Sequence, residues 1–183
     1  MSEKIIVKYC SPTLAGIKTG SLFSCSFDNH NELFGFLREL NLSLRSKGIR
    51  FFPLRIKNNK ALIYAFRPLR LYSELKNKEA KKLLSQRGYN TDNYGKCLAL
   101  LMKRLGDGED FPHEIGLFLG YPVEDVKGFI ENKAACAKCV GCWKVYGDED
   151  RARRLFNQYR KCTRVYEKQW RAGKPLTKLA VAS

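Results

Sequence analysis

The sequence has few histidines and no long apolar run, and each shortage excludes a class of protein. Its two histidines cannot form a histidine-rich metal site. The longest apolar run covers only residues 97–102, whereas a membrane-spanning helix needs roughly 20 apolar residues. Charged residues flank the apolar residues 5–7, so the N-terminal segment has no signal-peptide core. We therefore expect a cytoplasmic protein without a transmembrane segment.

Common catalytic and nucleotide-binding motifs are also missing. The sequence has no Walker-type phosphate loop, dinucleotide-binding fingerprint, nucleophile elbow or metalloprotease motif. With 44% hydrophobic and 12% aromatic residues among 183, the chain can nevertheless build a sizeable core, so disorder is not expected. The sequence therefore leaves open whether the protein is an enzyme.

Acidic residues are much rarer than basic ones, and the excess is unevenly distributed. The chain has 18 Asp and Glu against 34 Lys and Arg, a net charge of +16. Residues 45–104 carry sixteen basic and three acidic residues, whereas residues 105–126 carry six acidic and no basic ones. Such an excess favours a polyanionic partner such as nucleic acid, although Lys and Arg also keep exposed helix faces soluble. If the protein binds nucleic acid, we expect contacts from Arg50, Arg55, Lys57, Lys60, Lys78, Lys81 and Lys82.

Apolar periodicity predicts strands early in the chain. Short strands are expected at residues 5–7 and 22–27, and a β-hairpin at residues 51–66. Pro53 cannot donate a hydrogen bond to a neighbouring strand, so its strand is expected at a sheet edge. Between these elements a helix is expected. Asp28 or Asn29 can cap its start, and Gly48 is expected to end it.

Helical patterns dominate the rest of the chain. They lie around residues 72–84, 98–105, 113–119, 122–130 and 148–170. The helix at 98–105 is expected to stop at Gly106 and Gly108. We predict one α+β domain over residues 1–183, with a small N-terminal sheet and a helical C-terminal half. It is strand-rich over 1–67 and helix-rich over 68–171, and a short tail covers 172–183.

Residues 115–129 have the spacing of small and apolar residues seen in a helix-turn-helix motif. The recognition helix of such a motif would begin with Glu124 and Asp125, inside the acidic segment. Phosphate contacts dominate affinity for DNA, and these charges would be repelled by the duplex. We interpret the segment as a packed helical corner.

Three of the seven cysteines form a C-x₂-C-x₂-C run, at Cys136, Cys139 and Cys142. Such a run with a remote cysteine, here Cys162, can bind a [4Fe–4S] cluster, and four thiolates can equally bind zinc. A C-x-x-C pair can instead exchange thiols and disulfides with a redox partner protein. Cys162 also lies on the apolar side of its helix, where a buried structural cysteine is the alternative interpretation.

Lysines surround this cysteine run. We expect Lys133, Lys138 and Lys144 to lower the pKa of the nearby thiols and so to favour metal binding or reactivity.

Pro112, His113 and Glu114 are expected at the start of a helix. There the helix dipole would keep the His113 imidazole neutral, as a general base or a metal ligand beside the Glu114 carboxylate. His113 and Glu114 are thus the candidates for catalysis. Alternatively, His113 only fixes the start of the helix by hydrogen bonding.

Two motifs, Pro-His-Glu at 112–114 and Leu-Gly-Tyr-Pro at 119–122, resemble those of the domain of unknown function 3793 family of bacterial and archaeal proteins. Residues 10–16, 143–147 and 161–163 are also similar to that family, so the likeness covers nearly the whole chain. The resemblance implies no activity. It implies that the family cysteine positions include Cys10, Cys139, Cys142 and Cys162. Cys136 departs from them, which puts in doubt any mechanism that requires Cys136.

Two functional hypotheses follow from the sequence. The first is a cysteine-based metal-binding or redox protein, with Cys136, Cys162 or Cys10 completing a site on Cys139 and Cys142. The second is a basic nucleic-acid-binding module without catalytic activity.

Overall fold

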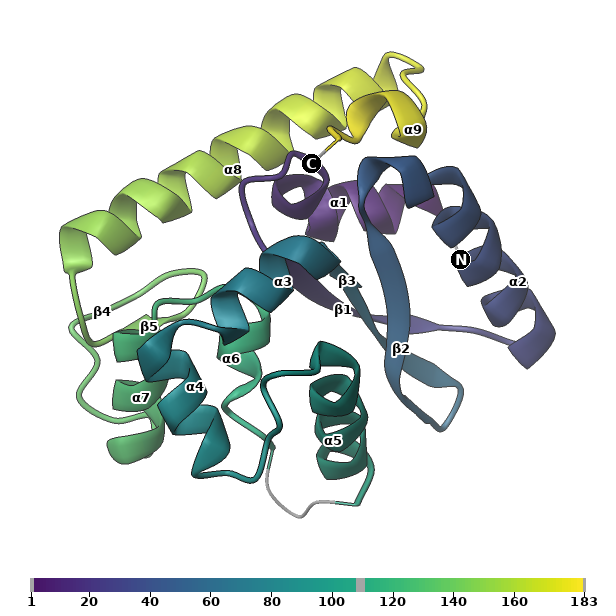
Figure 1. Ribbon diagram of the computed structural model, residues 1–183. Helices are drawn as coiled ribbons and strands as arrows, with labels where there is room; N and C mark the ends of the chain where they lie inside the picture. Colours follow the sequence, from purple (N-terminus) through teal and green to yellow (C-terminus); the bar gives the residue numbers. More distant parts are fainter. Residues whose placement is uncertain (1, 108–110, 183) are drawn as a thin grey trace. The chain divides into compact units, whose positions relative to one another are not determined.

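The computed structural model describes residues 2–107 and 111–182, apart from the Asp107 side chain. Figure 1 shows the helices and strands coloured along the sequence. The chain divides into two compact units. Unit 1 contains residues 1–69 and 159–183, and unit 2 contains residues 70–158.

A three-stranded antiparallel sheet lies in unit 1. Its strands β1 (Gly20–Ser26), β2 (Arg50–Lys57) and β3 (Lys60–Phe66) are in the order β1–β3–β2. The strand with Pro53 is therefore at an edge, as predicted, and its register shifts between Pro53 and Arg55. Asn58 and Asn59 form the β2–β3 turn with φ angles of 50° and 55°, a left-handed conformation that asparagine tolerates.

Helices α1 (Glu3–Leu14), α2 (His30–Ser43) and α9 (Leu176–Leu179) share one apolar core with this sheet. Helix α2 confirms the predicted helix, because the Asn29 side chain caps it by accepting a hydrogen bond from the Asn31 amide at 2.8 Å. A short 3₁₀ helix, η1 (Arg45–Lys47), follows α2 and ends at Gly48. The last part of α8 (Glu149–Arg171) also belongs to unit 1.

The strand predicted at residues 5–7 is wrong, because these residues lie in helix α1. Their β-branched side chains favour a strand locally. However, Ile6, Cys10 and Leu14 recur at helical spacing and are fully buried. Packing of this face in the core therefore outweighs the local preference.

Unit 2 is mainly helical. Helix α3 (Pro68–Leu75) begins at the end of the first segment of unit 1 and continues into unit 2 from Arg70. The other helices of unit 2 are α4 (Lys78–Ser85), α5 (Tyr94–Asp107), α6 (Ile115–Phe118), α7 (Val123–Glu131) and the first part of α8. The one helix predicted at residues 72–84 is two, because Asn77 caps α4 by accepting hydrogen bonds from the Glu79 and Ala80 amides. Helix α5 continues through Gly106, and Gly108 lies outside the described residues.

A small hairpin of β4 (Cys139–Val140) and β5 (Lys144–Val145) also lies in unit 2 and was not predicted. The α+β class is confirmed, with an N-terminal three-stranded sheet and a largely helical second half of the chain. Within residues 2–107 and 111–182, no helix is both long and apolar enough to cross a membrane.

Candidate functional site

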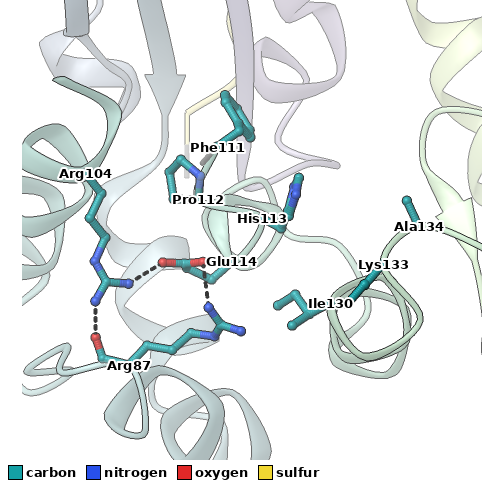
Figure 2. A pocket seen from close by; sticks show the side chains of 9 residues that line it. All are labelled: Arg87, Arg104, Phe111, Pro112, His113, Glu114, Ile130, Lys133 and Ala134. Atoms are coloured by element: carbon teal, nitrogen blue, oxygen red, sulfur yellow. Dashed lines mark hydrogen bonds and ion pairs between the residues drawn. The ribbon is translucent and has the colours of Figure 1, made fainter. Parts of the chain in front are cut away.

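Glu114 is a buried acidic side chain at a pocket of unit 2. Its residue surface is 1% exposed. Its carboxylate accepts hydrogen bonds from the Tyr89 hydroxyl at 3.0 Å, Arg104 Nη1 at 2.5 Å and Arg87 Nη1 at 3.4 Å. Figure 2 shows the two guanidinium groups converging on this carboxylate. These contacts hold the Arg104 guanidinium closely and the Arg87 guanidinium more loosely against the carboxylate.

The two arginines are only partly buried. Their side chains are 36% exposed at Arg87 and 33% exposed at Arg104. Arg104 also donates to the backbone carbonyl of Arg87, and its guanidinium carbon lies 4.8 Å from the centre of the Tyr89 ring. Burial and the Glu114 charge raise the pKa of the Tyr89 hydroxyl, so this group stays a neutral donor.

Both arginines line a cavity of about 570 Å³. This volume is within the range of small-molecule sites. The other lining residues are Phe111, Pro112, His113, Glu114, Ile130, Lys133 and Ala134.

His113 is an exposed residue in the lining of this cavity. Its ring centre is 5.9 Å from that of Phe111 and 4.8 Å from that of Phe129. Within the described residues, the imidazole makes these ring contacts but no hydrogen bond. Its alternative role, to fix the helix start by hydrogen bonding, stays a prediction. The catalytic roles of His113 and Glu114 stay a prediction.

The three clustered cysteines lie in or beside the β4–β5 hairpin. Cys139 begins β4 and is half-buried, whereas Cys142 lies in the connecting turn and is exposed. Cys136 precedes the hairpin, is exposed and has a φ of 58°.

Asp125 holds this hairpin in place. The residue is 2% exposed, and its Oδ2 accepts a hydrogen bond from the Trp143 indole nitrogen at 2.7 Å. Its Oδ1 accepts from the amides of Tyr146 at 2.7 Å and Gly147 at 2.8 Å. A buried carboxylate with three donors is therefore the main polar anchor of residues 143–147.

The expected effect of the lysines on Cys139 is wrong. Lys138 Nζ donates to the Gly147 carbonyl and Lys144 Nζ donates to the Ala134 carbonyl, each at 2.7 Å. Desolvation and the negative charge of Glu149 raise the pKa of the Cys139 thiol above its usual value. The Cys139 thiol is therefore less readily ionised than an ordinary cysteine.

The two remote cysteines belong to unit 1. Cys10 is fully buried in α1, and burial raises the pKa of its thiol. Cys162 is half-buried on α8, and burial raises the pKa of its thiol to about 11. Across the described ranges, no group of three or more His, Cys, Asp or Glu residues could hold a metal ion. Metal binding by Cys136, Cys139, Cys142, Cys162 or Cys10 stays a prediction.

The basic residues singled out from the sequence fall in both units. Arg50, Arg55, Lys57 and Lys60 are in unit 1, and Lys78, Lys81 and Lys82 are in unit 2. Arg50 is half-buried, and its guanidinium donates to the Ile49 carbonyl at 3.0 Å. Lys57 and Lys60 are exposed and face each other beside the hairpin turn. Lys81 forms an ion pair with Asp92 at 3.0 Å.

The division into units reveals where the charge is concentrated. Unit 1 contains 18 basic and 5 acidic residues, a net charge of +13 of the total +16. Unit 2 contains 16 basic and 13 acidic residues, a net charge of +3.

Helix α8 carries part of the unit 1 charge as an exposed stripe that the sequence reasoning missed. Its residues recur every three or four positions, which places them on one face of the helix. In the part of the chain that the structure describes, they have no carboxylate partner. They are Lys161, Arg164, Lys168 and Arg171. Their spacing was visible in the sequence, but it is equally that of an ordinary solvated face.

Comparison with known proteins identifies one family. Its sequence model, described as "Protein of unknown function (DUF3793)", matches residues 6–180. No curated protein and no solved structure matches the chain. The match confirms the resemblance that the Pro-His-Glu and Leu-Gly-Tyr-Pro motifs indicated.

Proposed function

The chain belongs to the domain of unknown function 3793 family, and from this premise we propose that it binds nucleic acid through unit 1. The supporting observation is the net charge of +13 on residues 1–69 and 159–183. A charge of this size and sign attracts a polyanion over several ångströms, within the limit set by salt screening.

The α8 stripe is the proposed contact surface. Lys161 and Arg171 are ten residues apart, which corresponds to about 15 Å along a helix. Long basic side chains over this distance can reach several successive phosphates of one strand. Arg55, Lys57 and Lys60 of the β2–β3 hairpin are further contacts from the same unit, whereas Lys78, Lys81 and Lys82 belong to unit 2.

Binding through these residues is independent of base sequence. Contacts from basic side chains to phosphates carry no sequence information. Among the aromatic side chains of the β2–β3 hairpin, Phe51 and Tyr64 are 2% and 0% exposed and cannot stack on bases, whereas Phe52 is 38% exposed. The four α8 cations alone contribute about −3.6 to the slope of log affinity against log salt concentration on duplex DNA. This contribution lowers the affinity about 10²-fold between about 50 and 200 mM salt.

The experiment measures fluorescence anisotropy of a labelled generic duplex and a single strand at several salt concentrations. One variant replaces the four α8 cations with glutamine, and a matched variant replaces four exposed unit 2 lysines. These are Lys78, Lys82, Lys96 and Lys103. Both variants lose four positive charges, so any difference between their affinities or salt slopes depends on where the replaced side chains lie. We expect the salt slope to decrease by about 3 to 4 in the α8 variant only.

Two outcomes contradict this proposal. If the wild-type protein binds neither nucleic acid at about 50 mM salt, unit 1 is not a nucleic-acid-binding unit. If the two variants lose affinity equally, binding follows net charge and the α8 stripe is not the contact surface.

A second candidate function is metal binding or thiol redox chemistry at the β4–β5 hairpin. The exposure of Cys136 and Cys142 favours it, because a hairpin anchored by Asp125 holds these thiols at the surface. Cys10, Cys25 and Cys97, by contrast, are buried. The hairpin thiols are suited to a [4Fe–4S] cluster, to zinc, or to exchange with a redox partner protein.

Metal analysis of protein purified without oxygen tests this second candidate. We expect iron with broad visible absorption, or zinc, and loss of the metal in a Cys139→Ala, Cys142→Ala variant. A Cys25→Ala, Cys97→Ala variant, which removes two buried thiols, is the control and should keep the metal. Metal-free protein whose hairpin thiols react no faster than its other thiols would rule out this function.

A further inference from the structure

We propose that the Glu114 pocket of unit 2 binds a small organic phosphate, a phosphate monoester with an apolar or flat organic group. This site is independent of the nucleic-acid proposal, because all its lining residues belong to unit 2. The charge of the lining, the available donors and the apolar surface beside them favour such a ligand.

The charge of the lining exceeds what the buried carboxylate needs. One guanidinium neutralises Glu114, and Arg104 does so at 2.5 Å, assisted by the Tyr89 hydroxyl. Arg87 approaches the same carboxylate only at 3.4 Å. With Lys133 as a third cation, the lining carries a net charge of +2, which matches the dianion of a phosphate monoester.

Donors remain available on these cations. A guanidinium has five N–H groups. Arg87 uses one of them on Glu114, and Arg104 uses one on Glu114 and one on the Arg87 carbonyl. The Lys133 backbone amide donates to the Ile130 carbonyl at 3.4 Å, but its side-chain ammonium has no hydrogen-bond or ion-pair partner within residues 2–107 and 111–182. Arginine pairs are suited to phosphate because their planar forks donate two parallel hydrogen bonds.

Glu114 orders the arginines without repelling a ligand strongly. Its carboxylate is almost fully buried, and both guanidinium groups lie against it (Figure 2). The Arg104 guanidinium is therefore oriented before a ligand binds, which lowers the entropy cost of binding, and Arg87 is held nearby by a longer contact.

Apolar side chains complete the lining and favour an organic group over free phosphate. Phe111 is 45% exposed, and its ring lies beside the His113 imidazole. Ile130 and Lys133, near the end of α7, face the same cavity as the two arginines (Figure 2). A cavity of about 570 Å³ has room for both a phosphate and an attached ring.

Isothermal titration calorimetry of the full chain with four probes tests the proposal. The probes are phenyl phosphate, inorganic phosphate, benzoate and benzyl alcohol. We expect phenyl phosphate to bind at least about 10-fold more tightly than each of the other three, since it combines the dianion with the ring.

Two substitutions locate the binding. Arg87→Gln removes the looser of the two Glu114 contacts, and Lys133→Gln removes a side chain without a partner among the described residues. Each is expected to weaken phenyl phosphate binding at least about 10-fold. Lys127→Gln is the matched control, because Lys127 is an exposed residue of α7 that does not line this cavity. Circular dichroism and thermal unfolding confirm that the variants are folded.

Each negative result overturns a stated part of the proposal. No saturable binding of phenyl phosphate, or equal binding by Arg87→Gln, Lys133→Gln and Lys127→Gln, excludes a phosphate site in this pocket. Equal affinity for inorganic phosphate excludes recognition of an organic group, and equal affinity for benzoate excludes selection of a dianion.

Discussion

Replacing Arg67 with methionine tests whether one buried guanidinium connects three separate segments of unit 1. Arg67 is 2% exposed. Its Nε donates to the Thr13 carbonyl at 2.7 Å, and its Nη2 donates to the carbonyls of Leu14 at 2.8 Å and Val181 at 2.7 Å. Its Nη1 donates to the Lys47 carbonyl at 3.0 Å. The end of α1, the end of η1 and the C-terminal segment thus depend on one side chain.

The expected loss of stability follows from these contacts. A hydrogen bond from a charged donor contributes about 1.5–3 kcal/mol. Water can replace the partner at the half-buried Lys47 and the exposed Val181, so the main loss comes from the carbonyls of Thr13 and Leu14. Methionine recovers part of the lost packing. We therefore expect the free energy of unfolding to fall by about 3–5 kcal/mol.

Urea denaturation measures this loss, followed by circular dichroism and by tryptophan fluorescence. Agreement between the two signals checks that unfolding is two-state. Arg45→Met is the control, because Arg45 is an exposed residue of the same unit. The free energy of unfolding of this variant should stay within about 0.5 kcal/mol of wild type. A loss of less than about 1 kcal/mol for Arg67→Met, with an unchanged m-value, would refute this reasoning.

Three further predictions concern single side chains. Asp125→Ala is expected to lower the free energy of unfolding by about 2–4 kcal/mol and to speed thiol labelling of the β4–β5 hairpin. Mass spectrometry after alkylation measures the labelling, and an unchanged rate would show that Asp125 does not anchor the hairpin. Glu149→Gln removes a charge that raises the pKa of the Cys139 thiol. At about pH 8 more thiolate then forms, so alkylation of Cys139 is expected to accelerate, and an unchanged rate counts against an effect of the Glu149 charge on this thiol. Gly20→Ala places a Cβ atom 2.4 Å from the Tyr64 ring, so we expect urea denaturation to show a free energy of unfolding lower by about 1–3 kcal/mol. A variant as stable as wild type would show that the ring moves aside freely.

Local signals explain which elements could be predicted from the sequence. The Asn29 cap marked the start of α2, and the Asn58–Asn59 pair marked the turn of the β2–β3 hairpin. The N-terminal helix was missed because Pro12 looked like a break, although it lies within α1. Residues 176–179 form α9 in a segment predicted as a tail, because the contacts that order it come from distant parts of unit 1.

The candidate sites were less predictable, since they depend on contacts between distant residues. The Pro-His-Glu motif drew attention to Glu114, but Arg87 and Arg104 lie 27 and 10 residues away from it. The hairpin cysteines were visible as a motif. Their anchor, Asp125, is 18 residues before Trp143 and had been interpreted only as part of an acidic helix start. Periodicity reports which face of an element is buried, and it does not report which charges meet there.

The discontinuity of unit 1 has a consequence for shortened forms of the protein. Val181 accepts a hydrogen bond from Arg67, and its amide donates to the Leu14 carbonyl at 3.0 Å. A fragment of residues 1–158 cannot form these bonds, although it contains all of the contiguous unit 2. In such a fragment the first 69 residues lack their second segment, so we expect limited proteolysis to cut them before it cuts residues 70–158.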